Sequence, residues 1–323
     1  MCTAISYKTG CQYFGRNLDL EHRYCESVTI TPKRFPFEYR MVSGCNSHYA
    51  MIGMASVIDG YPLYYDATNA HGLSMAGLNF PGNAVYLPVK EDCDNIAPFE
   101  FIPWILQQCK TVAEAKLLLK RINLVDIPFS ASLPLSPLHW MIADKTESIV
   151  VEPMKDGIKI YDDPVGVLTN NPTFDFHLQN LNNYLNLTHE EPINRFAKKL
   201  ELTPYSRGMG AIGLPGDLSS ASRFVKAAFT KLNSISGDSE AESVSQFFHI
   251  LNSVAQQEGC VKVGNAFEKT IYSSCCNCDK GIYYYTTYEN SQITAVRLLK
   301  ENTDCDTLTL FPLFTTQQIR YEN

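Results

Sequence analysis

The chain has 323 residues, with 27 Lys and Arg against 34 Asp and Glu, and a net charge of -7. A hydrophobic content of 45% with 11% aromatic residues excludes a disordered chain. The acidic balance argues against a general nucleic-acid binder, and no apolar run approaches the length of about 18 residues that spans a bilayer. We therefore predict a folded protein with no nucleic-acid or membrane partner.

The N-terminal residues MCTAISYKTG lack the basic and apolar regions of a signal peptide, so a cytoplasmic protein is expected. The cysteine count of 11 is odd, so not all cysteines can pair with one another. Most are expected to be reduced, buried, small hydrophobic side chains, namely Cys11, Cys25, Cys45, Cys93, Cys109, Cys260 and Cys305. The length alone suggests two domains of about 150 residues each. No linker or repeat divides the chain, however, and we predict one domain over residues 1–323.

Strands dominate the first third of the predicted structure. Residues 3–16 form a hairpin around the turn at residues 8–10, because β-prone runs flank Gly10. Further strands are expected at residues 28–32, ending at a proline, and at residues 49–56.

Helices and further strands follow. Helices are predicted at residues 111–122, 221–232 and 239–254, the first and third opening with a capping box. Strand pairs are predicted at residues 148–153 with 158–162 and at residues 282–288 with 292–298. This order implies an α+β protein in which helices cover antiparallel sheet.

The densest group of thiols is Cys275, Cys276 and Cys278. A zinc site is disfavoured there, because adjacent cysteines on a strand point to opposite faces and no second C-x-x-C pair is present. The chain also lacks the G-x-S-x-G, Walker A and G-x-G-x-x-G motifs and the papain-type cysteine signature. We predict no metal and no cofactor.

Cys2 differs from the other cysteines by its position. Methionine aminopeptidases remove Met1 when the next residue is small, and this removal would leave one residue with both a thiol and a free α-amine. An α-amine has a pKa of about 7.7–8.0, so it can accept the thiol proton at physiological pH. The alternative is an ordinary small second residue.

The returning strand of the first hairpin carries Arg16 and Asp19 back towards Cys2. A carboxylate there could hold the α-amine, and an arginine could lower the pKa of the thiol. The alternative is a surface ion pair, which contributes little to stability.

Motifs along nearly the whole chain resemble the choloylglycine hydrolases, N-terminal-nucleophile hydrolases that include bile salt hydrolases and penicillin V acylases. The matching segments are residues 1–5, 14–19, 76–81, 138–141, 166–174, 213–217, 221–224, 281–285 and 288–290. The likeness is greatest to bacterial bile salt hydrolases. The resemblance implies a four-layer αββα fold with two stacked antiparallel sheets, and a homotetramer.

The resemblance also implies roles for six residues. Cys2 matches the nucleophile, and Arg16 and Asp19 match polar residues that contact it. Asn79 matches the asparagine of the oxyanion hole, a position that is often tyrosine in penicillin V acylases. Asn170 matches an asparagine near the scissile amide, and Arg223 matches the active-site arginine. Without the resemblance, Asn79 would be read as a strand end, Asn170 as a turn residue and Arg223 as a solvated charge.

The substrate pocket is expected to have apolar walls. The segment 127–138 contains Pro128, Pro134 and Pro137, so it is predicted to be a loop with apolar side chains, which suits a pocket wall. The candidate substrate-binding residues are Leu18, Ile58, Phe129, Leu133, Leu135 and Leu138. Plain core packing is the alternative for each.

The resemblance thus implies hydrolysis of the amide bond in glycine- or taurine-conjugated bile acids through a Cys2 thioester. Asn79 favours bile salts over the alternative activity of a penicillin V or acyl-homoserine-lactone acylase. An alternative of a different class is a metal- or ligand-binding protein without catalysis.

Overall fold

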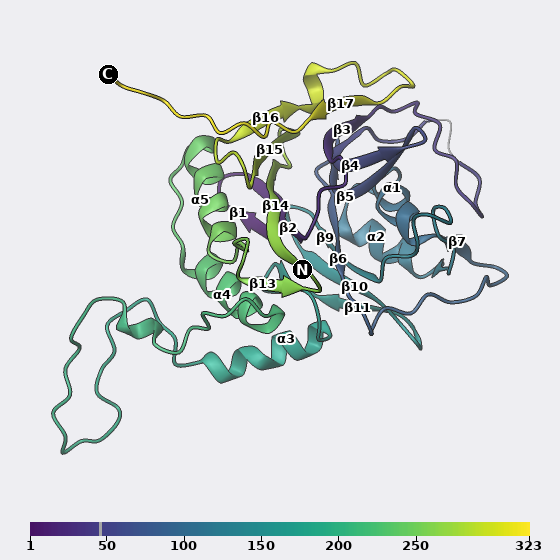
Figure 1. Cartoon of the computed structure of the whole chain (residues 1–323). Helices are drawn as coiled ribbons and strands as arrows, with labels where there is room; N and C mark the ends of the chain where they lie inside the picture. The colour runs from purple at the N-terminus through teal and green to yellow at the C-terminus, as the bar shows by residue number, and fades with distance from the viewer. Residues whose placement is uncertain (45–46) are drawn as a thin grey trace.

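The computed structural model describes residues 1–44 and 47–323, so the predicted buried Cys45 lies outside the described residues. Two large antiparallel sheets lie face to face in the described part of the chain, and helices cover their outer faces (Figure 1). This is the α+β arrangement of four layers that the sequence predicted.

The first sheet is built around the N-terminal hairpin. Its strand order is β12, β1, β2, β14, β15, β16, with β13 pairing to β14. The bounds are β1 Cys2–Lys8, β2 Gln12–Leu20, β12 Val167–Leu168, β13 Val261–Val263, β14 Ala266–Asn277, β15 Ile282–Thr287 and β16 Thr294–Arg297. The predicted hairpins at residues 3–16 and 282–298 are therefore confirmed. β14, for which no bounds were predicted, joins them.

The second sheet has the strand order β11, β10, β9, β6, β5, β4, β3, β17. The bounds are β3 Ser27–Thr31, β4 Met51–Ile58, β5 Tyr61–Asn69, β6 Ser74–Asn79, β9 Leu138–Ala143, β10 Ser148–Met154, β11 Gly157–Asp162 and β17 Thr309–Pro312. A separate parallel pair joins β7 Asp94–Ile96 to β8 Ile122–Leu124. The predicted strands at residues 28–32, 49–56, 148–153 and 158–162 all lie in the second sheet.

The helices are α1 Phe101–Leu106, α2 Val112–Leu119, α3 Phe174–Asn180, α4 Ser220–Asn233 and α5 Glu240–Asn252. Ser219 and Ser239 cap α4 and α5 through their side chains, and α5 has the predicted capping box. The helix predicted at residues 111–122 ends earlier, at Leu119, because the chain turns there into β8, which begins at Ile122.

Two apolar cores hold the layers together. One lies between the sheets and extends under α4 and α5, with Phe14, Met141 and Phe247 among its fully buried side chains. The other lies between the second sheet and α1 and α2, and contains Trp140 and Phe101. Because both faces of each sheet are covered, a polar side chain that points between the layers must find a partner there.

Candidate active site

The register of the N-terminal hairpin places Cys2 opposite Leu18 and Ala4 opposite Arg16. Directly opposed residues of an antiparallel pair project to the same side, so Cys2, Leu18 and Arg16 share one face of the first sheet. The Arg16 side chain shows that this face is directed towards the second sheet. Its Nη1 donates hydrogen bonds to the carbonyl oxygens of Tyr65, at 3.0 Å, and Gly77, at 2.5 Å.

Arg16 is fully buried in this interlayer space. Burial lowers the pKa of its guanidinium, but Cys2, Tyr272 and Asp66 lie close enough to outweigh that effect and raise the pKa overall. Asp66 is buried too and accepts hydrogen bonds from the hydroxyl of Tyr272 at 2.6 Å and that of Tyr283 at 2.7 Å. A permanently charged guanidinium is therefore fixed beside the Cys2 thiol.

Asp19 lies on the opposite face of β2 from Arg16, because the two residues are three positions apart and successive side chains of a strand alternate between its faces. Its Oδ1 accepts a hydrogen bond from Thr270 Oγ1 at 2.6 Å, whereas its buried Oδ2 has no hydrogen-bond partner among the described residues. Burial raises the pKa of Asp19, and the positive charge of Arg223 opposes that rise. The prediction that Asp19 lies near the first residue is borne out by its contacts with Met1, described below.

Arg223 and Asn170 bind the two polar groups of the Cys2 main chain. The Arg223 Nη1 donates to the Cys2 carbonyl oxygen at 2.5 Å and to Thr3 Oγ1 at 2.7 Å. The Asn170 Oδ1 accepts from the Cys2 nitrogen at 2.8 Å and from Arg223 Nη2 at 2.7 Å. Arg223 is only 1% exposed, so the alternative of a solvated charge is wrong.

Asn79 is the last residue of β6, and its carbonyl oxygen accepts a hydrogen bond from Asn170 Nδ2 at 2.7 Å. Asn170 thus links Asn79 to Cys2, although the three residues come from distant parts of the sequence. The carbonyl oxygen of Asn170 in turn contacts Nε2 of buried His177, at 2.8 Å. Burial lowers the pKa of His177 to about 4, so the imidazole is neutral and can donate to that carbonyl.

Met1 extends the hairpin by one residue. Its amine donates to the carbonyl oxygen of Asp19 at 2.7 Å and forms an ion pair with the carboxylate of Glu268. The amide of Asp19 donates to the Met1 carbonyl oxygen at 3.0 Å. While Met1 is attached, the Cys2 nitrogen is an amide, and removal of Met1 converts that nitrogen into an α-amine beside Asn170.

Four of the six candidate pocket residues fall into two groups. Leu18 is buried opposite Cys2, and half-buried Leu138 pairs with Asn79 across β6 and β9, so both border the catalytic candidates. Ile58 pairs with Tyr61 at the tip of the β4–β5 hairpin, and the Tyr61 ring lies 5.9 Å from the Phe129 ring. Leu18 and Leu138 therefore place apolar side chains beside Cys2 and Asn79, whereas Ile58 and Phe129 place them at the tip of the β4–β5 hairpin.

The loop at residues 127–137 is anchored by its main chain. Arg40 donates to the carbonyl oxygen of Phe129 at 2.8 Å, and its guanidinium lies 5.8 Å from the centre of the Phe129 ring. The Tyr86 hydroxyl donates to the carbonyl oxygen of Ser136 at 2.7 Å. Leu133 and Leu135 are half-buried in this loop, and no described contact joins them to Cys2.

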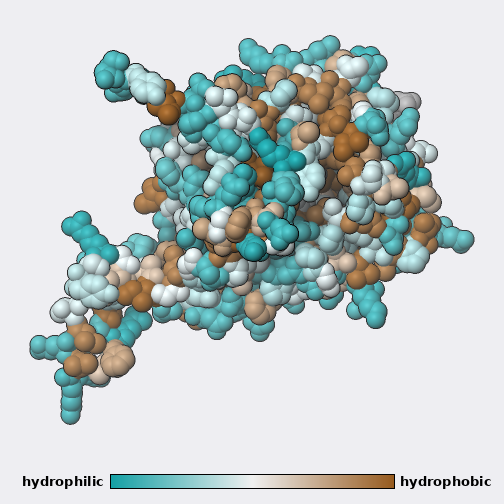
Figure 2. Space-filling model, in the orientation of Figure 1, coloured by the Kyte–Doolittle hydropathy of each residue, from teal (hydrophilic) through white to brown (hydrophobic). Residues whose placement is uncertain are grey.

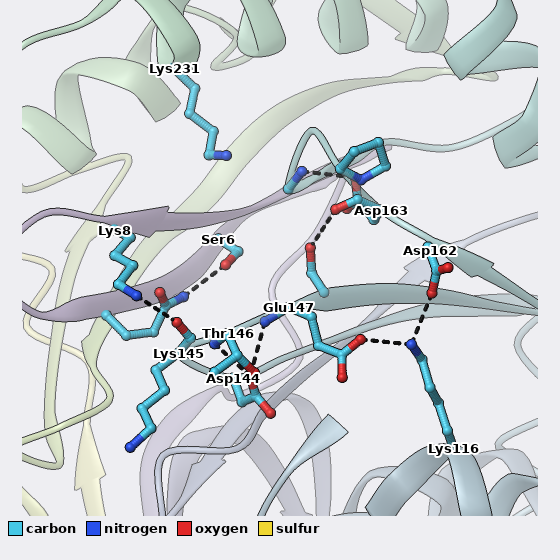
Figure 3. A pocket seen from close by; sticks show the side chains of 14 residues that line it. Ser6, Lys8, Lys116, Asp144, Lys145, Thr146, Glu147, Asp162, Asp163 and Lys231 are labelled. Atoms are coloured by element: carbon cyan, nitrogen blue, oxygen red, sulfur yellow. Dashed lines mark hydrogen bonds and ion pairs between the residues drawn. The ribbon is translucent and has the colours of Figure 1, made fainter. Parts of the chain in front are cut away.

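A separate hollow of about 390 Å³ lies at the far end of β1, where Lys8 contacts the turn between β9 and β10 (Figure 3). Charged side chains surround it, and Figure 3 shows Lys116 between the carboxylates of Glu147 and Asp162. A steroid requires apolar walls, so this hollow does not suit the expected substrate.

The remaining cysteines are only partly as predicted. Cys109, Cys275, Cys276 and Cys278 are buried and free, whereas Cys25 and Cys260 are free but exposed. The expectation of burial is therefore wrong for Cys25, which has a left-handed backbone just before β3, and for Cys260, which lies in the turn before β13. Cys11, Cys93 and Cys305 are half-buried.

No group of three or more His, Cys, Asp or Glu side chains in residues 1–44 and 47–323 is arranged to hold a metal ion. The alternative of a metal-binding protein thus gains no support from this part of the chain. Within the same residues, no helix combines the length and the apolar character needed to cross a membrane.

Comparison with known proteins agrees with this geometry. Residues 2–311 match the family described as linear amide C–N hydrolases, choloylglycine hydrolase family. The chain belongs to the choloylglycine hydrolase family. It is accordingly a hydrolase of linear amides, and its two stacked sheets with flanking helices are the N-terminal-nucleophile hydrolase fold that the sequence predicted.

Relatives in the family cover the whole chain. A bile salt hydrolase/transferase of Lactiplantibacillus plantarum is 57% identical over 98% of both chains, and one of Clostridium perfringens is 40% identical over 100% of both. The crystal structure of a variant of conjugated bile acid hydrolase from Clostridium perfringens superposes with a TM-score of 0.92 at 39% identity, covering 100% of both chains.

Penicillin V acylase from Agrobacterium tumefaciens matches over 98% of this chain and 99% of its own, with a TM-score of 0.72. At 17% identity this likeness shows the fold alone.

Sequence reasoning missed the contribution of β14. This strand pairs with β2 and carries Glu268 and Thr270 to Met1 and Asp19. It also carries Tyr272 to Asp66, which faces Arg16. The signal that predicts this strand is the β-prone run at residues 270–273, directly before the cysteines.

Proposed function

We propose that this protein hydrolyses the amide bond between a bile acid and glycine or taurine, with Cys2 as the nucleophile after removal of Met1. The observation that carries the proposal is the clamp on Cys2. Arg223 binds its carbonyl oxygen and Asn170 binds its nitrogen, so both main-chain polar groups of the residue that gains an α-amine are already held. Family membership and the named activities of the full-length relatives support the same reaction.

The reaction follows from these groups. The neutral α-amine of Cys2 accepts the thiol proton, directly or through water, while the adjacent guanidinium of Arg16 favours the thiolate. The thiolate attacks the amide carbonyl carbon, and the side chain of Asn79 with a nearby backbone N–H stabilises the oxyanion. A single donor of this kind contributes about 10²–10³ in rate.

The tetrahedral intermediate then collapses. The carbon–nitrogen bond breaks, and the proton held on the Cys2 amine passes to the departing glycine or taurine nitrogen. Water attacks the thioester to release the bile acid and restore the thiol. No metal or redox step is needed to balance this sequence.

The steroid part of the substrate is proposed to lie against Leu18 and Leu138 near the thiol, and against Ile58 and Phe129 further out. The rings of Tyr61, Phe99 and Phe129 pack together, with the Phe99 and Phe129 centroids 5.2 Å apart. Such rings provide large apolar area at a low entropic cost. Leu133 and Leu135 are proposed to complete the loop side of this wall.

A substrate panel tests the proposal. Purified protein with glycocholate, taurocholate, penicillin V and an acyl-homoserine lactone should release glycine or taurine faster than it cleaves the other two amides. Penicillin V as the far better substrate would instead identify a penicillin V acylase, and the lactone an acyl-homoserine-lactone acylase.

We also propose a homotetramer located in the cytoplasm. An arm between α3 and α4 projects from the body, and Figure 2 shows apolar side chains on its surface. Leu185, Phe196 and Tyr205 on this arm are 83%, 84% and 85% exposed. Large apolar side chains held away from the body are typical of surfaces that contact a partner. Light scattering coupled to gel filtration should give four times the chain mass, and a monomer mass would contradict the tetramer.

A further inference from the structure

The removal of Met1 leaves a specific set of polar groups behind. In the structure, the Met1 amine contacts Glu268 and the Asp19 carbonyl oxygen, and the Met1 carbonyl oxygen accepts from the Asp19 amide. The Glu268 residue is only 4% exposed. Once Met1 departs, a buried carboxylate, a carbonyl oxygen and an amide N–H lose their partners together.

Buried polar groups need replacement partners. Two acceptors and one donor around the space of one residue suit a water molecule, which uses two to four polar partners. The same cleavage creates a new α-amine on Cys2. Because consecutive Cα atoms are about 3.8 Å apart, the positive charge of the N-terminal ammonium moves by only one residue along the chain. A water in the former Met1 position therefore reaches both Glu268 and the new amine.

The charges that face this position are known from every adjoining element. Asp19 comes from β2, Glu268 from β14 and Arg223 from α4, while Glu21 lies just beyond β2. Burial raises the pKa of Glu268, the N-terminal ammonium opposes that rise, and Asp19 and Glu21 add to it. Glu268 is thus a carboxyl group whose natural counter-ion is the chain's α-amine.

We infer that Glu268 positions the Cys2 α-amine in the processed enzyme, through one water held by Glu268 and the Asp19 main chain. The inference rests on the proposed function, because it requires Met1 to be removed. The thiol proton moves to the Cys2 nitrogen, giving thiolate and ammonium, and later leaves with the departing amine. Glu268 takes no proton in this sequence. It orients the nitrogen lone pair and stabilises the ammonium form.

The test compares Glu268→Gln and Glu268→Asp with wild type and with Glu258→Gln. Glu258 is a suitable control because its carboxylate, like that of Glu268, is paired with an ammonium group. Its partner is Lys269 of β14, at 3.0 Å, but the Glu258 side chain is 52% exposed. Mass spectrometry first establishes that each protein begins at Cys2. The pH dependence of kcat/KM is then measured on glycocholate, together with the pH dependence of iodoacetamide labelling at Cys2.

Activity requires the neutral amine, and the Glu268 carboxylate favours the ammonium. Glu268→Gln should therefore move the rising acid limb of kcat/KM down by about one pH unit and lower kcat about tenfold. Glu268→Asp should restore much of the wild-type profile, and Glu258→Gln should retain all of it. If Glu268→Gln does not fold, Glu268→Asp should still move the limb in the same direction by a smaller amount.

A rate lowered equally at every pH would show that Glu268 has only a structural role, and an unchanged profile would also overturn the inference. The labelling curve should move in the same direction as the activity curve. It needs no bile acid, so the inference can fail or survive separately from the proposed function.

Discussion

Two regions of the molecule concentrate thiol chemistry, and their surroundings differ. Cys275 and Cys276 lie in the middle of the first sheet, where burial raises the pKa of Cys275 and a hydrogen bond with Cys278 together with burial raises that of Cys276. Cys2 is as buried, at 2% exposure, but it lies among Arg16, Asn170 and Arg223 at the start of the chain.

The difference shows that a high local density of cysteines does not make a reactive site. A thiol in an apolar surrounding stays protonated, because its charged form is not solvated there. Near Cys2, a fixed guanidinium and a nitrogen that can become an amine supply the charge and the base. Substitutions at Cys2 and around the substrate should therefore change activity more than a substitution among the buried thiols.

Replacement of the nucleophile should have the largest effect. Cys2→Ser still permits removal of Met1, yet a hydroxyl is a far weaker nucleophile than a thiolate at neutral pH. We expect bile acid release to fall by at least about 10³-fold. The same change at exposed Cys260 serves as the control and should leave turnover near normal. Comparable activity in Cys2→Ser and wild type would remove Cys2 from the mechanism.

Loss of the oxyanion donor should have the next largest effect. Asn79→Ala is expected to lower kcat by about 10²–10³ with little change in KM, since the side chain acts on the transition state. Half-buried Asn83, which lies beyond β6, provides a matched control as Asn83→Ala. A rise in KM alone would assign Asn79 to binding instead.

The outer wall of the pocket should affect binding more than chemistry. Phe129→Ala removes a ring that packs on Tyr61 and Phe99, and the lost apolar contact should raise KM for glycocholate about tenfold. The value of kcat should change little, because Cys2 and its partners are untouched. Steady-state kinetics separate the two parameters. A fall in kcat at unchanged KM would place Phe129 nearer the reacting bond.

Changes in the buried thiol region should have the smallest effect on activity. Cys275→Ala should cost about 1 kcal/mol in the free energy of unfolding and leave kcat/KM at its wild-type value. Because burial raises the pKa of Cys275, iodoacetamide at neutral pH should leave this thiol unmodified in native wild-type protein. Loss of activity in Cys275→Ala, with the fold intact, would remove the contrast between the two regions.

Local patterns predicted the elements that carry most of this site. Alternation and turn residues predicted the β1–β2 hairpin, and periodicity with serine caps predicted α4 and α5. The roles of Asn79, Asn170 and Arg223 came from the resemblance alone, because each residue by itself is typical of a strand end, a turn or a helix start. Only the folded chain brings Asn170 between Asn79 and Cys2.

Other features of the molecule could not be predicted from the sequence, because they depend on contacts in the folded chain. Glu268 follows no motif, and it reaches the N-terminus only because β14 pairs with β2 across more than two hundred residues of sequence. The exposed positions of Cys25 and Cys260 depend on the path of the backbone just before β3 and β13 rather than on composition. The single domain and the individual catalytic roles stay predictions.

The most direct test of the central claim is mass spectrometry of the N-terminal peptide after an acid quench during turnover of glycocholate. The account predicts a peptide that begins at Cys2 and carries a bile acyl group on that residue. It also predicts that hydroxylamine, which cleaves thioesters, removes this group. Full activity in protein that retains Met1, or an acyl group on any other residue, would contradict the account.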